Sequence, residues 1–152
     1  MKRKFIITLC TFLFAITLSA QENIFEKFEN MKGVTTIYIS PKMFSIIKEL
    51  KALDSSNVKI DQIINKLSSL HILSCENKEV AAKLRSEAAY IGKDKSYENL
   101  MKVKEENEHI SIYMKEGEDN DEYVLLMDNT DEFTIMIFKG KLTLEDIQKV
   151  IN

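Results

Sequence analysis

The sequence predicts an α+β fold: a two-layer sandwich whose mixed, mainly antiparallel sheet ends in a four-strand meander and carries its helices mostly on one face. Three observations support it. Apolar residues recur with a helical period through the first half of the chain. Strand-like segments separated by short polar turns fill the second half. The 152 residues, of which 45% are hydrophobic and 30% charged, match the length and composition of one globular domain.

The first twenty residues have the features of a cleavable export signal. Basic residues at positions 2–4 precede an apolar run from Phe5 to Leu18, and small residues end the run at Ala20. The run is shorter than the ~18 residues of a membrane span, and an uncleaved N-terminal anchor is the alternative. We expect cleavage near Ala20, a single α+β domain over residues 21–152 that does not span the membrane, and a periplasmic or secreted location.

The composition of residues 21–152 limits their partners. The full chain has 21 basic and 24 acidic residues, and loss of the three basic residues at positions 2–4 changes the net charge from −3 to −6. An acidic domain without a basic, aromatic-rich patch matches nucleic acid poorly, so we expect no nucleic-acid partner. Cys75 would be the only cysteine left, which excludes an internal disulfide. We expect it to be buried, and a free thiol that joins two copies is the alternative.

Residues 24–53 predict a helix, a strand and a second helix. The first helix ends at Gly33 and has its apolar residues at helical spacing: Ile24, Phe25, Phe28 and Met31. β-Branched and aromatic residues predict a strand from Val34 to Ile39. Ser40 then has the position of an N-cap before Pro41. The helix that follows carries one apolar face, made of Met43, Ile46, Ile47, Leu50 and Leu53.

Helix and strand alternate again after a polar break. A shorter helix over residues 60–67 leads into a strand from Leu70 to Cys75. Asn77 is placed to cap a further helix, which Gly92 ends. We expect the strand–helix–strand connections to be right-handed crossovers.

The second half predicts an antiparallel meander and a last helix. The four strands are expected at Leu100–Lys104, His109–Lys115, Glu122–Asp128 and Phe133–Phe138. Thr143 begins the helix, in which Asp146 completes a near capping box and Leu142 faces Ile147.

Two of these strands, Tyr123–Met127 and Phe133–Phe138, are apolar on both faces. A sheet with one solvated face should alternate more strictly. One interpretation is that a helix or the N-terminal segment covers the second face. The other is an exposed apolar patch that binds a partner or a ligand; its candidate residues are Tyr38, Tyr113, Tyr123, Met127 and Phe138.

Residue types suited to catalysis are few. His71, Cys75 and His109 are the candidates for a nucleophile and its base. Four residues of strand separate His71 from Cys75 by about 13 Å, so these two cannot act together. A site of Cys75 with His109 stays open, but no orienting acid is indicated. A zinc site needs about four ligands, which two histidines and one cysteine do not supply. No glycine-rich phosphate loop is present either. We therefore expect that the chain is not an enzyme and binds no metal or cofactor.

The most acidic segment is the loop from Glu116 to Glu122. Asp119 and Asp121 alternate as calcium ligands do, but the turn glycine and the distal glutamate of a helix–loop–helix calcium site are missing. A solvated hairpin turn is the favoured interpretation, and weak calcium binding is the alternative.

Four stretches of the predicted domain are similar to one family: Phe25–Phe44, Leu67–Asn77, Tyr97–Gly117 and Glu122–Val150. The chain resembles a family of small exported Bacteroidetes proteins described as domain of unknown function 4252. None of the stretches is a catalytic motif, so the resemblance implies the fold more than a function. It also implies export to a Gram-negative periplasm or beyond.

These observations favour an exported envelope protein without enzymatic activity that binds another protein, either an envelope partner or a second copy. A small-ligand or lipid carrier is the alternative, and an enzyme is the least favoured.

Overall fold

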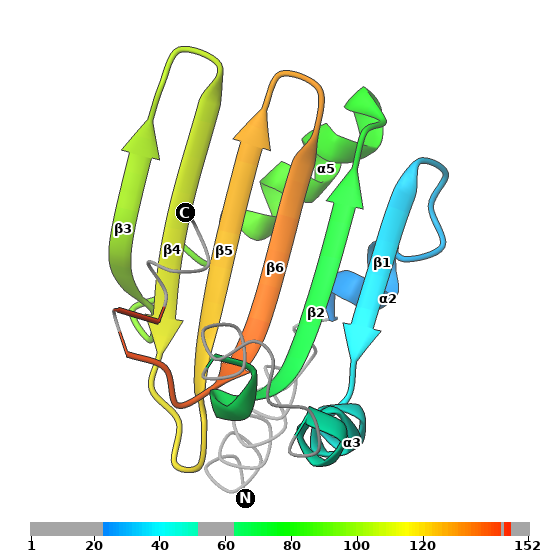
Figure 1. Cartoon of the computed structure of the whole chain (residues 1–152). Coiled ribbons are helices and arrows are strands. Elements are labelled where there is room, and N and C mark those ends of the chain that lie inside the picture. Colours follow the sequence, from blue (N-terminus) through cyan, green and yellow to red (C-terminus); the bar gives the residue numbers. More distant parts are fainter. Residues whose placement is uncertain (1–22, 52–62, 144, 147–152) are drawn as a thin grey trace, which may run out of the picture.

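The computed structural model describes residues 23–51, 63–143 and 145–146. These residues form an open six-stranded sheet in the order β1-β2-β6-β5-β4-β3 (Figure 1). The strands are β1 (Val34–Ile39), β2 (Leu67–Cys75), β3 (Glu98–Lys104), β4 (Glu108–Lys115), β5 (Asp121–Asn129) and β6 (Phe133–Gly140). The helices that accompany them are α2 (Ile24–Phe28), α3 (Pro41–Lys51) and α5 (Lys78–Ala88).

The α+β class and the C-terminal meander are confirmed, but the described strands are all antiparallel rather than mixed. The predicted crossover to a parallel strand is wrong for β1 and β2, whose register pairs Val34 with Cys75 and Ile39 with Leu70. The reason lies in α3, which packs at the end of the sheet where β1 finishes and β2 starts (Figure 1). The connection therefore returns to the same end of the sheet, as antiparallel neighbours require.

Local signals start the helices where the sequence predicts, but two helices end earlier than predicted: α2 at Phe28 rather than at Gly33, and α5 at Ala88 rather than at Gly92. Asn77 Oδ1 accepts a hydrogen bond from the backbone N–H of Glu79 at 3.1 Å and caps α5. Ser40 Oγ accepts from the N–H of Met43 at 3.2 Å at the start of α3. Gly33 has φ of 81° after α2, a conformation that favours glycine.

The predicted helix over residues 60–67 ends earlier than expected. Residues 63–66 form a helical turn and β2 already begins at Leu67, while residue 60 lies outside the described residues. Gly140 allows this early start, because a Cβ at that position would collide with the carbonyl of Lys66. The close approach extends the pairing of β2 with β6 to Leu67 and Gly140.

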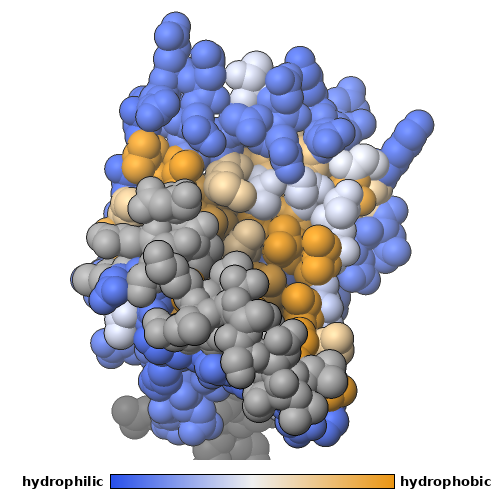
Figure 2. Space-filling model, viewed as in Figure 1, coloured by the Kyte–Doolittle hydropathy of each residue, from blue (hydrophilic) through white to orange (hydrophobic). Residues whose placement is uncertain are grey.

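Each face of the sheet carries its own hydrophobic cluster. Helices α2 and α5 lie behind the sheet in Figure 1, and their buried side chains pack there against Leu73, Val124 and Ile135. The cluster on the opposite face contains Ile112, Tyr123, Leu125 and Phe138, each at most 5% exposed. Figure 2 shows apolar residues across the middle of that face and hydrophilic residues toward the strand ends. The strands that are apolar on both faces are therefore buried at their centres on both faces.

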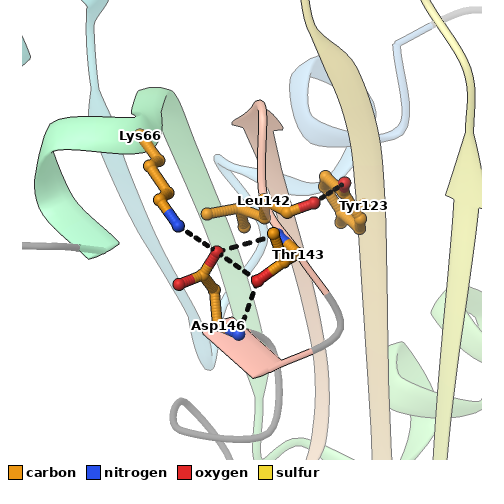
Figure 3. Close-up of polar contacts among 5 residues, drawn as sticks. All are labelled: Lys66, Tyr123, Leu142, Thr143 and Asp146. Carbon is orange, nitrogen blue, oxygen red and sulfur yellow. Dashed lines mark hydrogen bonds and ion pairs between the residues drawn. The ribbon is translucent and has the colours of Figure 1, made fainter.

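A polar network holds the chain after β6 (Figure 3). The N–H and Oγ1 of Thr143 donate to Asp146 Oδ2 at 2.8 and 2.7 Å, and the Asp146 N–H donates back to Thr143 Oγ1, which confirms the predicted capping box. Lys66 Nζ lies 2.6 Å from the same carboxylate. The hydrogen bond from Lys66, followed by those from Thr143, lowers the pKa of Asp146 to about 2. Tyr123 Oη donates to the Leu142 carbonyl at 2.9 Å and ties this segment to β5.

Some predictions fall outside the described part of the chain. They are the export signal at residues 1–20, the position of Leu53 and the contact of Leu142 with Ile147. Within the described ranges, no helix combines the length and the apolar character needed to cross a membrane.

Candidate interaction surface

The structure divides the five residues of the predicted apolar patch between the two faces of the sheet. Tyr113 packs against the helix-side cluster, and Tyr38 lies on the same side, next to His71. Tyr123, Met127 and Phe138 belong to the opposite face. The rings of Tyr123 and Phe138 stack at 5.3 Å and are 1% and 4% exposed. The five residues therefore form no common surface, and Tyr38, at 60% exposed, is the one that a partner can reach most directly.

Strand β1 forms one edge of the described sheet, and part of its backbone has no partner strand among the residues that the structure describes. The Glu76 N–H donates to the Gly33 carbonyl at 3.3 Å, which marks these two residues as a hydrogen-bonded pair. Because bonded and non-bonded pairs alternate in an antiparallel ladder, the peptide groups of Thr36 and Tyr38 point away from β2. Val34 lies two residues before Thr36, so its peptide group also points away from β2, and its N–H donates to the Met31 carbonyl instead. The outer edge of β1 thus offers backbone donors and acceptors to an incoming strand.

Exposed apolar side chains gather at this same edge. In the described part of the chain, the large hydrophobic residues that are exposed lie in β1 and α3: Ile37 at 47%, Tyr38 at 60%, Met43 at 47% and Ile46 at 38%. We name the outer edge of β1 together with these four side chains the β1–α3 surface. Exposed apolar residues that cluster in this way are typical of an interaction site.

The orientation of α3 explains part of this exposure. The sequence grouped Met43 and Ile46 on the apolar face of the helix, but Phe44 is the residue that is buried, at 4% exposed. Lys48 Nζ donates to the Leu67 carbonyl at 2.8 Å and fixes α3 beside the start of β2. The helix therefore sits against the end of the sheet and leaves Met43 and Ile46 exposed to solvent.

A row of aromatic rings supports β1 from the helix side. Phe25 of α2 stacks on His71 of β2 with centroids 3.5 Å apart, and Tyr38 lies tilted against His71 at 5.0 Å. Burial lowers the pKa of His71, and the nearby Glu29 opposes this shift. Thr36 Oγ1 is buried beside this row and has no hydrogen-bond partner among the described residues. The edge strand is thus held by packing, while one of its hydroxyl groups is left unsatisfied.

The opposite edge of the sheet is protected. Strand β3 carries Glu98, Lys102 and Lys104, and its register shifts between Asn99 and Met101. Charged side chains and bulges are the usual devices that prevent an edge strand from pairing with another chain. Strand β1 has neither, since its sequence Val-Thr-Thr-Ile-Tyr-Ile is uncharged and its register with β2 is unbroken.

A small cleft opens on the helix side next to Tyr38. It has a volume of about 220 Å³, and Asn23, Phe25, Tyr38, Ser69, His71, Glu122, Ile137 and Lys139 line it. Its two charged groups are paired with each other: Glu122 contacts Lys139 at 3.3 Å and also accepts from Tyr97 Oη at 2.5 Å. Burial, followed by the hydrogen bond to Glu122, raises the pKa of Tyr97. The cleft is smaller than the roughly 300–1,000 Å³ of typical ligand pockets.

A second hollow, of about 520 Å³, lies where three loops meet at the ends of the strands. It is more open, and Glu76, Lys78, Asn107, Asn129, Thr130, Asp131 and Glu132 line it. Asn129 Oδ1 accepts from the N–H groups of Asp131 and Glu132 at 3.0 and 2.7 Å, and Glu132 also accepts from Thr134 Oγ1. These contacts are those of a structured turn.

The candidate catalytic residues are not brought together. Cys75 is fully buried as a free thiol, as the sequence predicts, and lies four residues along β2 from His71. His109 occupies the same row of the sheet as Cys75, but Phe133 and Asp128 stand between them on β6 and β5. Three strand spacings make that separation about 14 Å, which excludes a direct Cys75–His109 pair.

The acidic loop is likewise engaged in local contacts. Asp121 accepts from the Gly117 N–H at 3.2 Å and pairs with Lys141 at 3.1 Å. The hydrogen bond from Gly117, followed by that from Lys141, lowers the pKa of Asp121. Across the described ranges, no group of three histidine, cysteine, aspartate or glutamate residues is arranged to hold a metal ion.

Sequence reasoning missed Ile37, Met43 and Ile46 as surface residues. A strand composed of uncharged residues was the available signal, because the other edge strand carries charges. The signal could not be used without knowing which strands are at the edges, and strand order depends on contacts that are distant in sequence.

Comparisons with known proteins locate the chain within a family. A family model described as a domain of unknown function (DUF4252) matches residues 28–150. No curated protein and no solved structure matches the chain.

Proposed function

This chain belongs to the DUF4252 family, since the match spans residues 28–150, and from that premise we propose that it is an exported, non-enzymatic module that binds a protein partner at the β1–α3 surface. The observation that carries the proposal is the coincidence of two features at one edge. Within residues 23–51, 63–143 and 145–146, no strand lies beside the outer peptide groups of β1, and the exposed large apolar side chains lie at the same edge.

These two features suit an extended protein segment. A strand added to a sheet edge gains affinity from main-chain hydrogen bonds and specificity from alternate side chains. At the β1 edge, Ile37 would contact one face of the added strand and Tyr38 the other, since consecutive strand residues point to opposite faces. The next residues, in α3, extend the apolar contact through Met43 and Ile46.

The N-terminal sequence supports export. Basic residues at positions 2–4, the apolar run from Phe5 to Leu18 and the small residues before Gln21 are the parts of a cleavable signal. The mass of the protein purified from its native host tests this directly. Cleavage after Ala20 gives a chain that begins at Gln21, whereas an intact N-terminus would contradict export by this route.

The cleft beside Tyr38 favours one alternative, a carrier of a small ligand. Its aromatic wall and the ammonium of Lys139 suit a small molecule with an apolar part and a negative charge. Its volume of about 220 Å³ leaves little room for a ligand, and Lys139 already forms an ion pair with Glu122. Bound mass in native mass spectrometry of protein from its host would favour this alternative over a protein partner.

Site-specific photo-cross-linking in the native host tests the protein-binding proposal. A photoreactive amino acid replaces Tyr38 on the β1 edge in one variant and Lys102 on the β3 edge in the control. We expect a discrete cross-linked protein band from position 38 and none from position 102. Equal labelling from both positions, or no discrete band from either, would contradict the proposal.

A further inference from the structure

We propose that the partner at the β1–α3 surface is a second copy of this chain, with β1 of one copy paired antiparallel to β1 of the other across a two-fold axis. This inference rests on the proposed function and names its partner. The pairing would join two six-stranded sheets into one continuous antiparallel sheet, because every strand pair within each copy is already antiparallel.

The backbone of β1 is suited to pair with itself. Two antiparallel copies of one strand are related by a two-fold axis, so each copy offers the same donors and acceptors to the other. The outward peptide groups are those of Thr36 and Tyr38, as inferred from the bond between Gly33 and Glu76. An axis through Thr36 places Tyr38 of one copy opposite Val34 of the other; the Tyr38 N–H can then donate to the Val34 carbonyl, while the Val34 N–H stays with the Met31 carbonyl.

The side chains of β1 do not oppose this arrangement. An isologous interface brings equal charges near each other wherever charged residues lie near the axis. Strand β1 has no charged residue, so the pairing carries no such repulsion. By contrast, pairing of β3 edges would have to desolvate Glu98, Lys102 and Lys104 and accommodate a bulge. The charge pattern therefore selects β1 as the edge that joins two copies.

Thr36 offers a candidate position for the axis. Thr36 Oγ1 has no hydrogen-bond partner in the described structure and is covered by its own chain, which is costly for a polar group. When the axis passes through Thr36, the same residue of the second copy lies directly opposite. Threonine hydroxyls that face each other across two strands can form a hydrogen bond, which here requires the Thr36 side chain to rotate toward the second copy.

The apolar residues of the surface would be covered by the same contact. Ile37 and Ile39 lie on one face of β1, and Ile37 is 47% exposed in the single chain. With the axis at Thr36, Ile37 of one copy faces Thr35 of the other in a non-hydrogen-bonded pair, where side chains approach most closely. Tyr38 would pack over Val34 of the second copy on the helix side.

The mass of the purified protein in solution tests the inference. The chain is produced with its export signal in the native host, purified, and measured by multi-angle light scattering over a range of concentrations. We expect the mass of a dimer for the wild type. Ile37→Lys should give a folded monomer, because it places two ammonium groups beside the axis, whereas Asn99→Lys, which adds the same charge on the exposed β3 edge, should remain a dimer. Circular dichroism confirms that both variants are folded.

Cysteine cross-linking tests the axis. Thr35→Cys and Ile37→Cys chains are mixed and oxidised, and the two thiols should form a disulfide because non-bonded strand pairs have Cα atoms about 4.5 Å apart, within the range that a disulfide spans. Wild-type chains, whose Cys75 is buried, serve as the control. A wild-type monomer at all concentrations, a dimer that persists in Ile37→Lys, or an absence of this disulfide would overturn the inference. If the wild type is monomeric while position 38 still cross-links a different protein in the host, the second copy is refuted and the binding function stands.

Discussion

The two edges of the sheet differ in their side chains, although both expose half of their peptide groups. Strand β1 presents six uncharged residues in an unbroken register, two of which, Ile37 and Tyr38, are large and exposed. Strand β3 presents Glu98, Lys102 and Lys104 and contains a bulge. One edge therefore has the protection that prevents pairing with another chain, and the other lacks it.

The comparison shows that β1 can be exposed at its outer edge and still be firmly packed on its helix side. Phe25, His71 and Tyr38 form a row of rings behind it, and Phe28 of the adjoining helix α2 is 1% exposed. An edge strand that was merely loose would not have this packing beneath it. Strand β1 is thus packed firmly on the helix side, while its outer edge has no strand beside it among the described residues.

The largest expected effect separates the edge from the centre of the sheet. Phe138→Asp would bury a carboxylate beside Tyr123 and should destabilise the fold by about 4 kcal/mol or more. Ile37→Asp, on a side chain that is 47% exposed, should change the stability of the single chain by only about 0.5 kcal/mol while it prevents association. Loss of the dimer adds a decrease in apparent stability that depends on protein concentration. Urea denaturation of both variants measures the two free energies of unfolding.

This pair of substitutions also sharpens the sequence-based prediction of an apolar patch. If Phe138→Asp gives a folded monomer that no longer binds its partner, then Phe138 is part of the binding surface. Loss of folding by Ile37→Asp would show that β1 is part of the core and not an available edge.

Much of the fold was predictable because its signals are local. Asn77, Ser40 and the pair Thr143–Asp146 cap their segments through residues two to three positions away, so the sequence alone reveals them. The alternation of residues from His109 to Lys115 likewise predicts β4.

The surface was less predictable because it depends on strand order and register. Tyr123 and Phe138 are exposed or buried according to which strands flank them, and their stacking follows from the register that pairs these two residues across β5 and β6. The orientation of α3, which buries Phe44 and exposes Met43, is set by its contact with the start of β2. Contacts distant in sequence decide each of these features, and no local pattern reports them.

The second-largest effect is expected when the charged residues that protect the β3 edge are removed. Lys102→Thr combined with Lys104→Ile makes the end of β3 resemble β1. A chain with two unprotected edges can pair at both, so we expect assemblies with at least roughly twice the mass of the wild-type species, measured by light scattering. Lys78→Thr with Lys83→Thr changes the charge equally on α5, away from both edges, and should leave the mass unchanged. Equal assembly of the two double variants would show that net charge, rather than edge protection, controls association.

A smaller effect compares the backbone of the two edges directly. The Glu105 N–H donates to the Glu108 carbonyl, so by alternation the peptide groups of Lys102 and Lys104 point outward from β3. If β1 is paired with another strand, the amide protons of Thr36 and Tyr38 should exchange more slowly with solvent than those of Lys102 and Lys104. Hydrogen exchange monitored by NMR measures this, and Ile37→Lys should remove the protection by a factor of about ten or more. Fast exchange at all four amides in the wild type would indicate two unoccupied edges.

The smallest effect concerns the support of β1 rather than its outer side. Burial lowers the pKa of His71 from its ordinary value of 6.5, so the folded chain binds this proton less readily than the unfolded chain does. At pH 8 the group is neutral in both states and contributes nothing to the pH dependence. As the pH falls through 6.5, the unfolded chain becomes protonated first, and the free energy of unfolding should decrease until the pH passes below the folded pKa. The lowered carboxylate pKa of Asp146, about 2, leaves that group ionised throughout this window.

His71→Phe isolates this contribution, because it keeps a ring between Phe25 and Tyr38 but cannot be protonated. Urea denaturation between pH 8 and pH 5 should give a shallower loss of stability for His71→Phe than for the wild type. Equal slopes for the wild type and His71→Phe would mean that burial does not weaken proton binding by this ring, and that the firm packing which distinguishes the β1 edge is absent.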